Sequence, residues 1–455
     1  MGIKIGLLPL YLKLYDDASP ETRSKVEPFY HEIAEVLSRK GAEVVTSPVC
    51  RVRKEFARAL DEFSAQSVDA VVTIHLAYSP SLEVIEPLLE SNLPIVVLDT
   101  TPDYDFGPHQ DAAKISFNHG IHGAQDMCSM LVRNQREFFI EAGHWEHSDV
   151  LDRVLGRVRA ISAARSLKGM KIGLIGDPFA GMGDFQVSPE VLEQEIGVKI
   201  IPFSEQQPTS PDVLSALQQD IELSGSLEDV PEGALKANLQ ITEHIMSWMN
   251  SEGLSGFTCN FLQVTRDLQV NRVPFLAASY GMYKGFGYAG EGDVLTASMV
   301  SALLKINPRS SFAEMFCPDW AGNQIFLSHM GEVNPRVCDP FRYTMKAYRY
   351  SDADEPVYAV GQFSGGDASV VNLVPLAGGK FRLIIAPVTV HSYPDSSFTK
   401  SVHGWVRPAE GSISEFLQRY SMLGGTHHKA VVYNEDVEVL RTFGMTAGWD
   451  VQVIR

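Results

Sequence analysis

Short β-type segments alternate with longer helical patterns through the first third of the chain, and this alternation limits the possible folds more than any other feature. The candidate strands are rich in Val and Ile, with no clean apolar–polar alternation, and a helical pattern over 20–40 separates the first two. Strands of this kind are typical of a parallel sheet that helices cover on both faces. The segment therefore predicts βαβ units in a Rossmann-like, doubly wound sheet. The candidate strands are residues 4–8, 43–46, 70–76 and 95–99.

A related pattern begins again near residue 170. The segment Lys171–Ile175 reads KIGLI and is similar to Lys4–Leu8, which reads KIGLL, and both lead into a loop that contains proline. A basic helical pattern over 152–168 precedes the second segment, and helical patterns over 212–223 and 233–250 follow it. We interpret residue 169 as the start of a second α/β domain.

The character of the chain changes after about Pro335. From Tyr343 to Val390 the sequence is rich in β-formers and glycine, with candidate strands at 370–374 and 381–386 around a Gly378-Gly379 turn. This pattern predicts an antiparallel hairpin or small barrel. A chain of 455 residues is also too long for one hydrophobic core. We therefore predict three domains: a Rossmann-like N-terminal domain (1–168), a central α/β domain (169–320) and a C-terminal β-rich, barrel-like domain (321–455).

Charge and cysteine usage exclude several classes of protein. The net charge of −18 argues against binding nucleic acid or an anionic membrane surface, since both require clustered Lys and Arg. The five cysteines are scattered and show no CxxC spacing, so neither a disulfide framework nor a thiolate zinc site is indicated. No apolar run approaches membrane-spanning length, and the first residues do not resemble a signal peptide. We expect a cytoplasmic protein.

Two acidic residues are candidates for chemistry. Glu291 stands between Gly290 and Gly292 before an apolar helical pattern, so a sharp turn could present it as a metal ligand or a base. The alternative is an ordinary helix start that Asp293 caps. Glu314 follows an apolar segment, where an acid often has a shifted pKa. Its alternative is an exposed position at the end of a strand.

Three histidines are candidate ligands. His329 has apolar neighbours, which is more often typical of a core histidine. His427 and His428 follow Gly424-Gly425, and a polar surface loop would explain them equally well. Neighbouring residues of an extended chain point to opposite sides, so we expect at most one of this pair to face a given metal. Two carboxylates and two imidazoles would suit Mn²⁺, Mg²⁺ or a similar divalent ion.

These residues lie in segments that resemble, in order and rough spacing, the metal-site segments of the L-arabinose isomerase and L-fucose isomerase family. Two further segments are also similar to that family, Asn118 with His122-Gly123 and Gly143–Trp145, so the resemblance extends over most of the chain. The metal-site segments are Gly287–Asp293 with Thr296-Ala297, Ser311–Glu314, Gly322-Asn323 with Leu327–Met330, Glu332-Val333 and Pro335, and Gly424–His428.

The resemblance implies a metal-dependent aldose–ketose isomerase that acts on an open-chain monosaccharide through a cis-enediol. The cofactor would be Mn²⁺ or another divalent cation such as Mg²⁺ or Co²⁺, and both Glu residues would also transfer protons. The family assembles as homotrimers or homohexamers with intersubunit active sites. The implied metal ligands are Glu291, Glu314, His329 and His428, and the implied sugar contacts are His122, His427 and Tyr11.

The sequence also departs from the family pattern. L-arabinose isomerases carry a Gln near a Tyr in the first strand-loop, whereas this chain reads Leu8-Pro9-Leu10-Tyr11. The segment between Glu291 and Glu314 is shorter than in typical members, so we expect a different sugar. Two alternatives stay open: a non-catalytic sugar-binding protein, which two α/β units resemble, and a sugar epimerase on the same scaffold. A nicotinamide enzyme is disfavoured because no G-x-G-x-x-G follows the first strand.

Overall fold

The computed structural model describes residues 2–207 and 209–455, and the chain forms two compact units, Met1–Ser162 and Ala163–Arg455. Each unit contains its own sheets and hydrophobic clusters. None of the described helices combines the length and the apolar character needed to cross a membrane.

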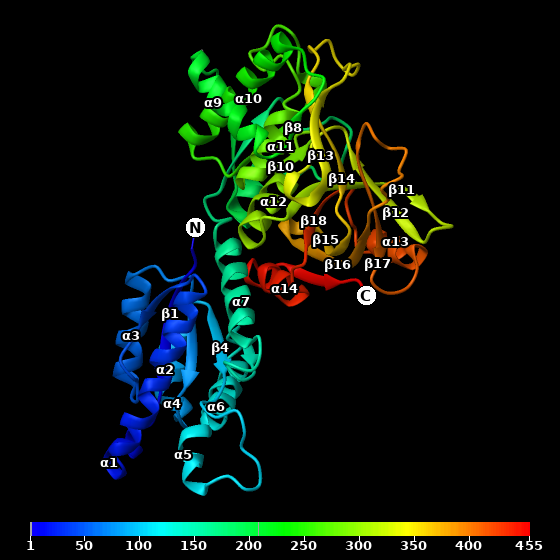
Figure 1. Ribbon diagram of the computed structural model, residues 1–455. Helices are drawn as coiled ribbons and strands as arrows, with labels where there is room; N and C mark the ends of the chain where they lie inside the picture. The colour runs from blue at the N-terminus through cyan, green and yellow to red at the C-terminus, as the bar shows by residue number, and fades with distance from the viewer. Residues whose placement is uncertain (1, 208) are drawn as a thin grey trace. The chain divides into compact units, whose positions relative to one another are not determined.

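The first unit is built on a five-stranded parallel sheet with the strand order β2-β1-β3-β4-β5. Figure 1 labels β1 and β4 of this sheet among the helices of the unit. Its strands are β1 (Lys4–Leu10), β2 (Glu43–Thr46), β3 (Ala70–His75), β4 (Ile95–Asp99) and β5 (Phe139–Ala142). Its helices are α1 (Lys13–Ala18), α2 (Glu21–Arg39), α3 (Arg53–Ala65), α4 (Ser81–Glu90), α5 (Ile115–Asn118), α6 (Gly120–Arg133) and α7 (Val150–Arg165), the last of which extends across the unit boundary.

Helices cover both faces of this sheet. In β1, Ile5 and Leu7 pack with side chains of α2 and α7, whereas Leu8 and Leu10 pack with side chains of α3, α4 and α6. Strands buried in this way need apolar residues at successive positions, which explains their Val- and Ile-rich sequences. The predicted Rossmann-like, doubly wound arrangement is confirmed.

The second unit begins with a four-stranded parallel sheet in the order β10-β9-β6-β7. Its strands are β6 (Lys171–Ile175), β7 (Lys199–Pro202), β9 (Gly256–Cys259) and β10 (Gly287–Gly290). The accompanying helices are α8 (Pro189–Val191), α9 (Pro211–Glu222), α10 (Glu232–Glu252), α11 (Phe275–Lys284) and α12 (Val294–Ile306). Apart from Lys305, every residue of α12 is buried, because this helix packs on strands of the parallel sheet and also on β11, β15 and β18 of the next sheet.

The next sheet closes on itself. An additional pairing between β16 and β17 joins the ends of a six-stranded antiparallel ring, β16-β15-β18-β11-β12-β17, so these strands form a barrel, and β8, β13, β14 and β19 extend it. The ring strands are β11 (Ser310–Asp319), β12 (Gln324–His329), β15 (Gly366–Pro375), β16 (Phe381–His391), β17 (Val402–Pro408) and β18 (His428–Tyr433). The other strands are β8 (Ser226–Leu227), β13 (Cys338–Met345), β14 (Val357–Phe363) and β19 (Asp450–Val453), and two further helices are α13 (Ile413–Met422) and α14 (Val437–Thr446).

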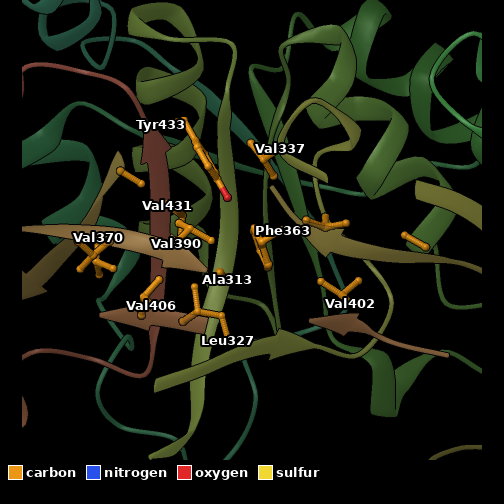
Figure 2. Close-up of a cluster of buried hydrophobic side chains, with 14 of the residues drawn as sticks. Ala313, Leu327, Val337, Phe363, Val370, Val390, Val402, Val406, Val431 and Tyr433 are labelled. Carbon is orange, nitrogen blue, oxygen red and sulfur yellow. The ribbon is translucent and has the colours of Figure 1, made fainter. Parts of the chain in front are cut away.

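A single hydrophobic cluster joins the strands of the barrel. Figure 2 shows side chains from β11, β12, β15, β16, β17 and β18 converging on one another. The labelled members include Ala313, Leu327, Val370, Val390 and Val431, all of which are almost fully buried. The predicted β-rich, barrel-like domain is confirmed as a fold class. The boundary predicted at residue 320 stays a prediction, and β11, which ends just before it, is a barrel strand.

Candidate metal centre

Glu291 occupies a sharp turn between β10 and α12. Its backbone is left-handed, with φ of 66°, and Gly292 follows with φ of 81°. A Cβ at Gly292 would lie 2.6 Å from the Cα of Pro178, and a Cβ at Gly290 would lie 3.0 Å from Cε1 of His329. The left-handed backbone and close packing therefore require Gly292, and a side chain at position 290 would displace the His329 imidazole. The Glu291 side chain is 10% exposed.

Three neighbouring barrel strands carry Glu314, His329 and His428. Glu314 on β11 pairs directly with His428, the first residue of β18, and with Ser328 on β12, which precedes His329. Side chains of directly paired residues lie on the same face of a sheet, so the register brings Glu314 and His428 together. The Phe312 ring packs edge-on against both imidazoles, with centroid distances of 4.8 Å to His329 and 5.0 Å to His428.

The ligand atoms of these residues have the spacing of a shared cation site. His428 Nε2 lies 2.9 Å from Glu314 Oε1 and 3.5 Å from Glu291 Oε2, and His329 Nε2 lies 3.2 Å from Glu314 Oε1. Ligands held about 2.1 Å from one ion are themselves about 3.0 to 3.4 Å apart in octahedral or tetrahedral geometry. Among the described residues, Glu291 Oε2 and His428 Nε2 are buried without a hydrogen-bond partner. A divalent cation would satisfy both atoms, so the donor set fits the metal that the resemblance implies.

Two further carboxylates contact the histidines at Nδ1, the ring nitrogen that does not face the proposed ion. Asp293 Oδ2 lies 2.9 Å from Nδ1 of His428, while Asp293 Oδ1 accepts a hydrogen bond from the Thr296 N–H at 2.8 Å and caps α12. Glu332 Oε1 lies 2.8 Å from Nδ1 of His329. Such partners fix the tautomer and orientation of metal-binding imidazoles. From the sequence, Asp293 was predicted only as a cap, and Glu332 was placed in a family-like segment without a role of its own; the His-x-x-Glu spacing was the available signal.

The electrostatics of the cluster favour a bound cation. Burial alone would raise the pKa of Glu291, but His427 and His428 lower it to about 2. Burial likewise opposes ionisation of Glu314, yet His329 and His428 bring its pKa well below the ordinary value. For His329, the neighbouring Glu332 and Glu314 outweigh burial and raise the pKa to about 10. The same negative field that holds a proton on the imidazole would attract a divalent ion.

Both members of the His427–His428 pair face the cluster, which differs from the expectation that at most one would. Their ring centroids are 4.2 Å apart, and His427 Nε2 lies 3.5 Å from Glu291 Oε2. The reason is that His427 precedes β18 and follows Gly424, whose φ is 85°, so strand alternation does not apply to it. The ligand atoms of Glu291, Glu314, His427 and His428 all lie within 4.8 Å of one another. That group does not include His329, which joins it through Glu314.

The two remaining predicted sugar contacts belong to the first unit. Tyr11 directly follows β1 and is fully buried, and its hydroxyl has no hydrogen-bond partner among the described residues. His122 is exposed on α6, with its ring 5.9 Å from that of His119. Their role toward a sugar stays a prediction.

A cavity of about 230 Å³ opens beside His329. A β-bulge in β11, between Met315 and Cys317, sets Phe316 out of register with β12, and Phe316 lines this cavity. Aromatic walls with a few polar groups are typical of small-molecule sites. This lining could not be predicted from the sequence, because its members come from separate segments. They include Phe275, Tyr348, Tyr350 and Tyr358, together with Ser328, Lys346 and Ser401.

Comparison with known proteins agrees with this geometry. The family model of the L-arabinose isomerase central domain matches residues 212–308, and that of the L-arabinose isomerase C-terminal domain matches residues 309–450, which together exceed half of the chain.

A solved solute-binding protein from Actinobacillus succinogenes with bound D-allose aligns at 13% identity over 67% of this chain and 92% of its own, but its TM-score of 0.18 does not establish a shared fold.

Full-length relatives extend the match to nearly the whole chain. The L-arabinose isomerase of Shouchella clausii is 24% identical over 99% of this chain and 93% of its own. Those of Aeromonas hydrophila and Geobacillus kaustophilus are 24% and 25% identical, over 95% and 90% of this chain and 91% and 85% of their own. The chain therefore belongs to the L-arabinose isomerase family and is an enzyme of the aldose–ketose isomerase class.

Proposed function

We propose that this enzyme isomerises an open-chain aldose to the corresponding ketose through a cis-enediol, with a divalent ion held by Glu291, Glu314, His329 and His428. Mn²⁺ is the proposed ion, with Mg²⁺ and Co²⁺ as substitutes. The observation that carries the proposal is the convergence of two carboxylates from different sheets on Nε2 of His428, a fully buried ligand atom that makes no hydrogen bond among the described residues.

The two carboxylates would perform the proton transfers. When bound, the ion would polarise the carbonyl of the sugar and stabilise the negative charge that develops on its oxygen. The low pKa values keep Glu291 and Glu314 ionised at neutral pH, so either can accept a proton. One would take the proton from the carbon next to the carbonyl, and the other would help return it to the adjacent carbon or move the hydroxyl proton.

The sugar itself is proposed to differ from L-arabinose, because Leu8–Tyr11 carries no glutamine and the segment between Glu291 and Glu314 is short. The cavity beside His329 offers a volume and an aromatic lining that suit part of a monosaccharide. His122, His427 and Tyr11 are the proposed sugar contacts. We also propose that the enzyme is cytoplasmic and that it assembles as a homotrimer or homohexamer with intersubunit active sites.

A panel of aldoses with Mn²⁺ tests the reaction. We expect a ketose to form from at least one sugar and to disappear with a chelator. Formation of a new aldose instead would favour the epimerase, and sugar binding without turnover or metal would favour the binding protein. L-arabinose turnover comparable to that of the relatives would contradict the altered substrate.

The metal content of variants tests the site separately. Glu291→Ala and His428→Ala should each bind less Mn²⁺ than the unaltered enzyme, as measured by elemental analysis after gel filtration. If both variants kept full metal content, the assignment of the metal centre would be wrong.

A further inference from the structure

His427 stands where an additional ligand of the metal centre would lie. Its Nε2 is 3.5 Å from Glu291 Oε2, the same distance that separates this oxygen from Nε2 of His428. A hydrogen bond from nitrogen to oxygen normally spans about 2.7 to 3.2 Å. Two ligands bound about 2.1 Å from one ion are instead about 3.0 to 3.4 Å apart. The separation therefore suits two ligands of a common ion better than a hydrogen-bonded pair.

Asp184 fixes the imidazole in the orientation that a ligand needs. Its Oδ2 accepts a hydrogen bond from the backbone N–H of His427 at 2.9 Å and lies 2.7 Å from Nδ1 of the same residue. With a proton on Nδ1, the lone pair of Nε2 is directed toward Glu291. Asp293 holds His428 through Nδ1 in the same way, at 2.9 Å, and Glu332 forms an ion pair with Nδ1 of His329 at 2.8 Å. All three histidines of the cluster thus have the carboxylate partner that metal-binding histidines generally have.

Exposure separates His427 from the other two histidines. Its side chain is 36% exposed and that of Asp184 is 38% exposed, whereas the side chains of His428 and His329 are 0% and 4% exposed. A ligand on the solvent side is the one that an incoming oxygen atom can replace without disturbing the buried core.

We propose that His427 is a ligand of the metal ion in the sugar-free enzyme, with Asp184 as its positioning residue. The inference rests on the proposed function, because it requires a divalent ion at Glu291, Glu314 and His428. His427 would then bind the ion and would not contact the sugar alone. A sugar would approach the ion from its solvent-facing side.

Pulsed EPR on the full-length protein, loaded with Mn²⁺ and labelled with ¹⁵N-histidine, tests this proposal by counting the bound imidazole nitrogens without any sugar. His427→Gln should lose one nitrogen coupling relative to the unaltered protein. Asp184→Asn should keep the coupling and weaken Mn²⁺ binding about 10- to 100-fold, as is typical when the carboxylate partner of a ligand is removed. His109→Gln, at an exposed position in the first unit, is the matched control and should change neither value.

The proposal is overturned if His427→Gln keeps the nitrogen count and the Mn²⁺ affinity of the unaltered protein. A raised KM for the sugar in that variant, with unchanged Mn²⁺ binding, would assign His427 to the sugar alone. His428→Gln separates this failure from a failure of the metal centre. If His428→Gln loses metal while His427→Gln does not, only the present inference is wrong; if neither variant changes, the proposed metal centre is wrong as well.

Discussion

The two sides of the candidate metal centre are formed by different kinds of structure. On the barrel side, Glu314 and His428 are directly paired on adjacent antiparallel strands, so hydrogen-bonded register sets the spacing of their side chains, and His329 ends the neighbouring strand β12. On the opposite side, Glu291 depends on a left-handed backbone between two tightly packed glycines. The barrel side is therefore preorganised by regular structure, whereas the turn side depends on local packing. We expect the two sides to respond differently to substitution.

The largest effect should come from changing the two carboxylates. Glu314→Gln and Glu291→Gln should each lower kcat at saturating Mn²⁺ by on the order of 10²- to 10⁴-fold, the range for loss of a general acid or base. Glu314→Gln should also lose more metal, because Glu314 contacts both His329 and His428. Titration with Mn²⁺ measures this difference. Equal metal loss in both variants would contradict the expectation that the barrel side contributes more to metal binding than the turn.

Removal of the proposed metal should lower stability by the next largest amount, because the ion would join the turn after the parallel sheet to the barrel. At a Mn²⁺ concentration of 100 times Kd, binding to the folded state adds about 2.7 kcal/mol to the free energy of unfolding. Urea unfolding with Mn²⁺ and with a chelator measures this gain. His428→Ala should show no gain; an undiminished gain in that variant would mean that the ion binds elsewhere.

Substitution of the carboxylates that contact Nδ1 of the histidines should have intermediate effects on Mn²⁺ binding. Asp293→Asn and Glu332→Gln should each weaken Mn²⁺ binding about 10- to 100-fold, as measured by competition with a chelator. Asp293→Ala should in addition lower the free energy of unfolding by about 1 kcal/mol, because alanine cannot cap α12. If Asp293→Asn and Asp293→Ala were equally stable, the capping contact would not contribute.

The smallest effect is expected where the two sides touch. In Gly290→Ala the new Cβ would lie 3.0 Å from Cε1 of His329, so the imidazole must shift by a few tenths of an ångström. A typical cost of about 1 kcal/mol corresponds to about fivefold weaker Mn²⁺ binding. Gly233→Ala, where a Cβ would meet no atom within 4 Å, is the control and should bind Mn²⁺ normally. Unchanged affinity in Gly290→Ala would show that His329 tolerates displacement.

Local sequence patterns predicted the parallel sheets well. The predicted strand at 95–99 coincides with β4, and that at 70–76 is one residue longer than β3, because buried parallel strands require continuous apolar residues. The closing pair β16–β17 could not be predicted, since it depends on the twist and register of the whole ring.

The same limit applies to the candidate site. Glycine-flanked segments made Glu291 and the His427–His428 pair visible in the sequence. Asp184 was not visible, because it meets His427 across 243 positions of the chain. Contacts of that range come from tertiary packing, which short patterns do not contain.

The bulge at Phe316 divides β11 into two parts with different freedom to vary in length. On the barrel side of the bulge, a one-residue insertion or deletion would turn Glu314 to the other face of the strand and remove its carboxylate from the centre. Beyond the bulge, the hairpin toward β12 can absorb an extra residue without moving that carboxylate. Divergence in substrate preference can therefore proceed through length changes in the outer hairpin, while the inner strand has to conserve its residue count whatever its composition.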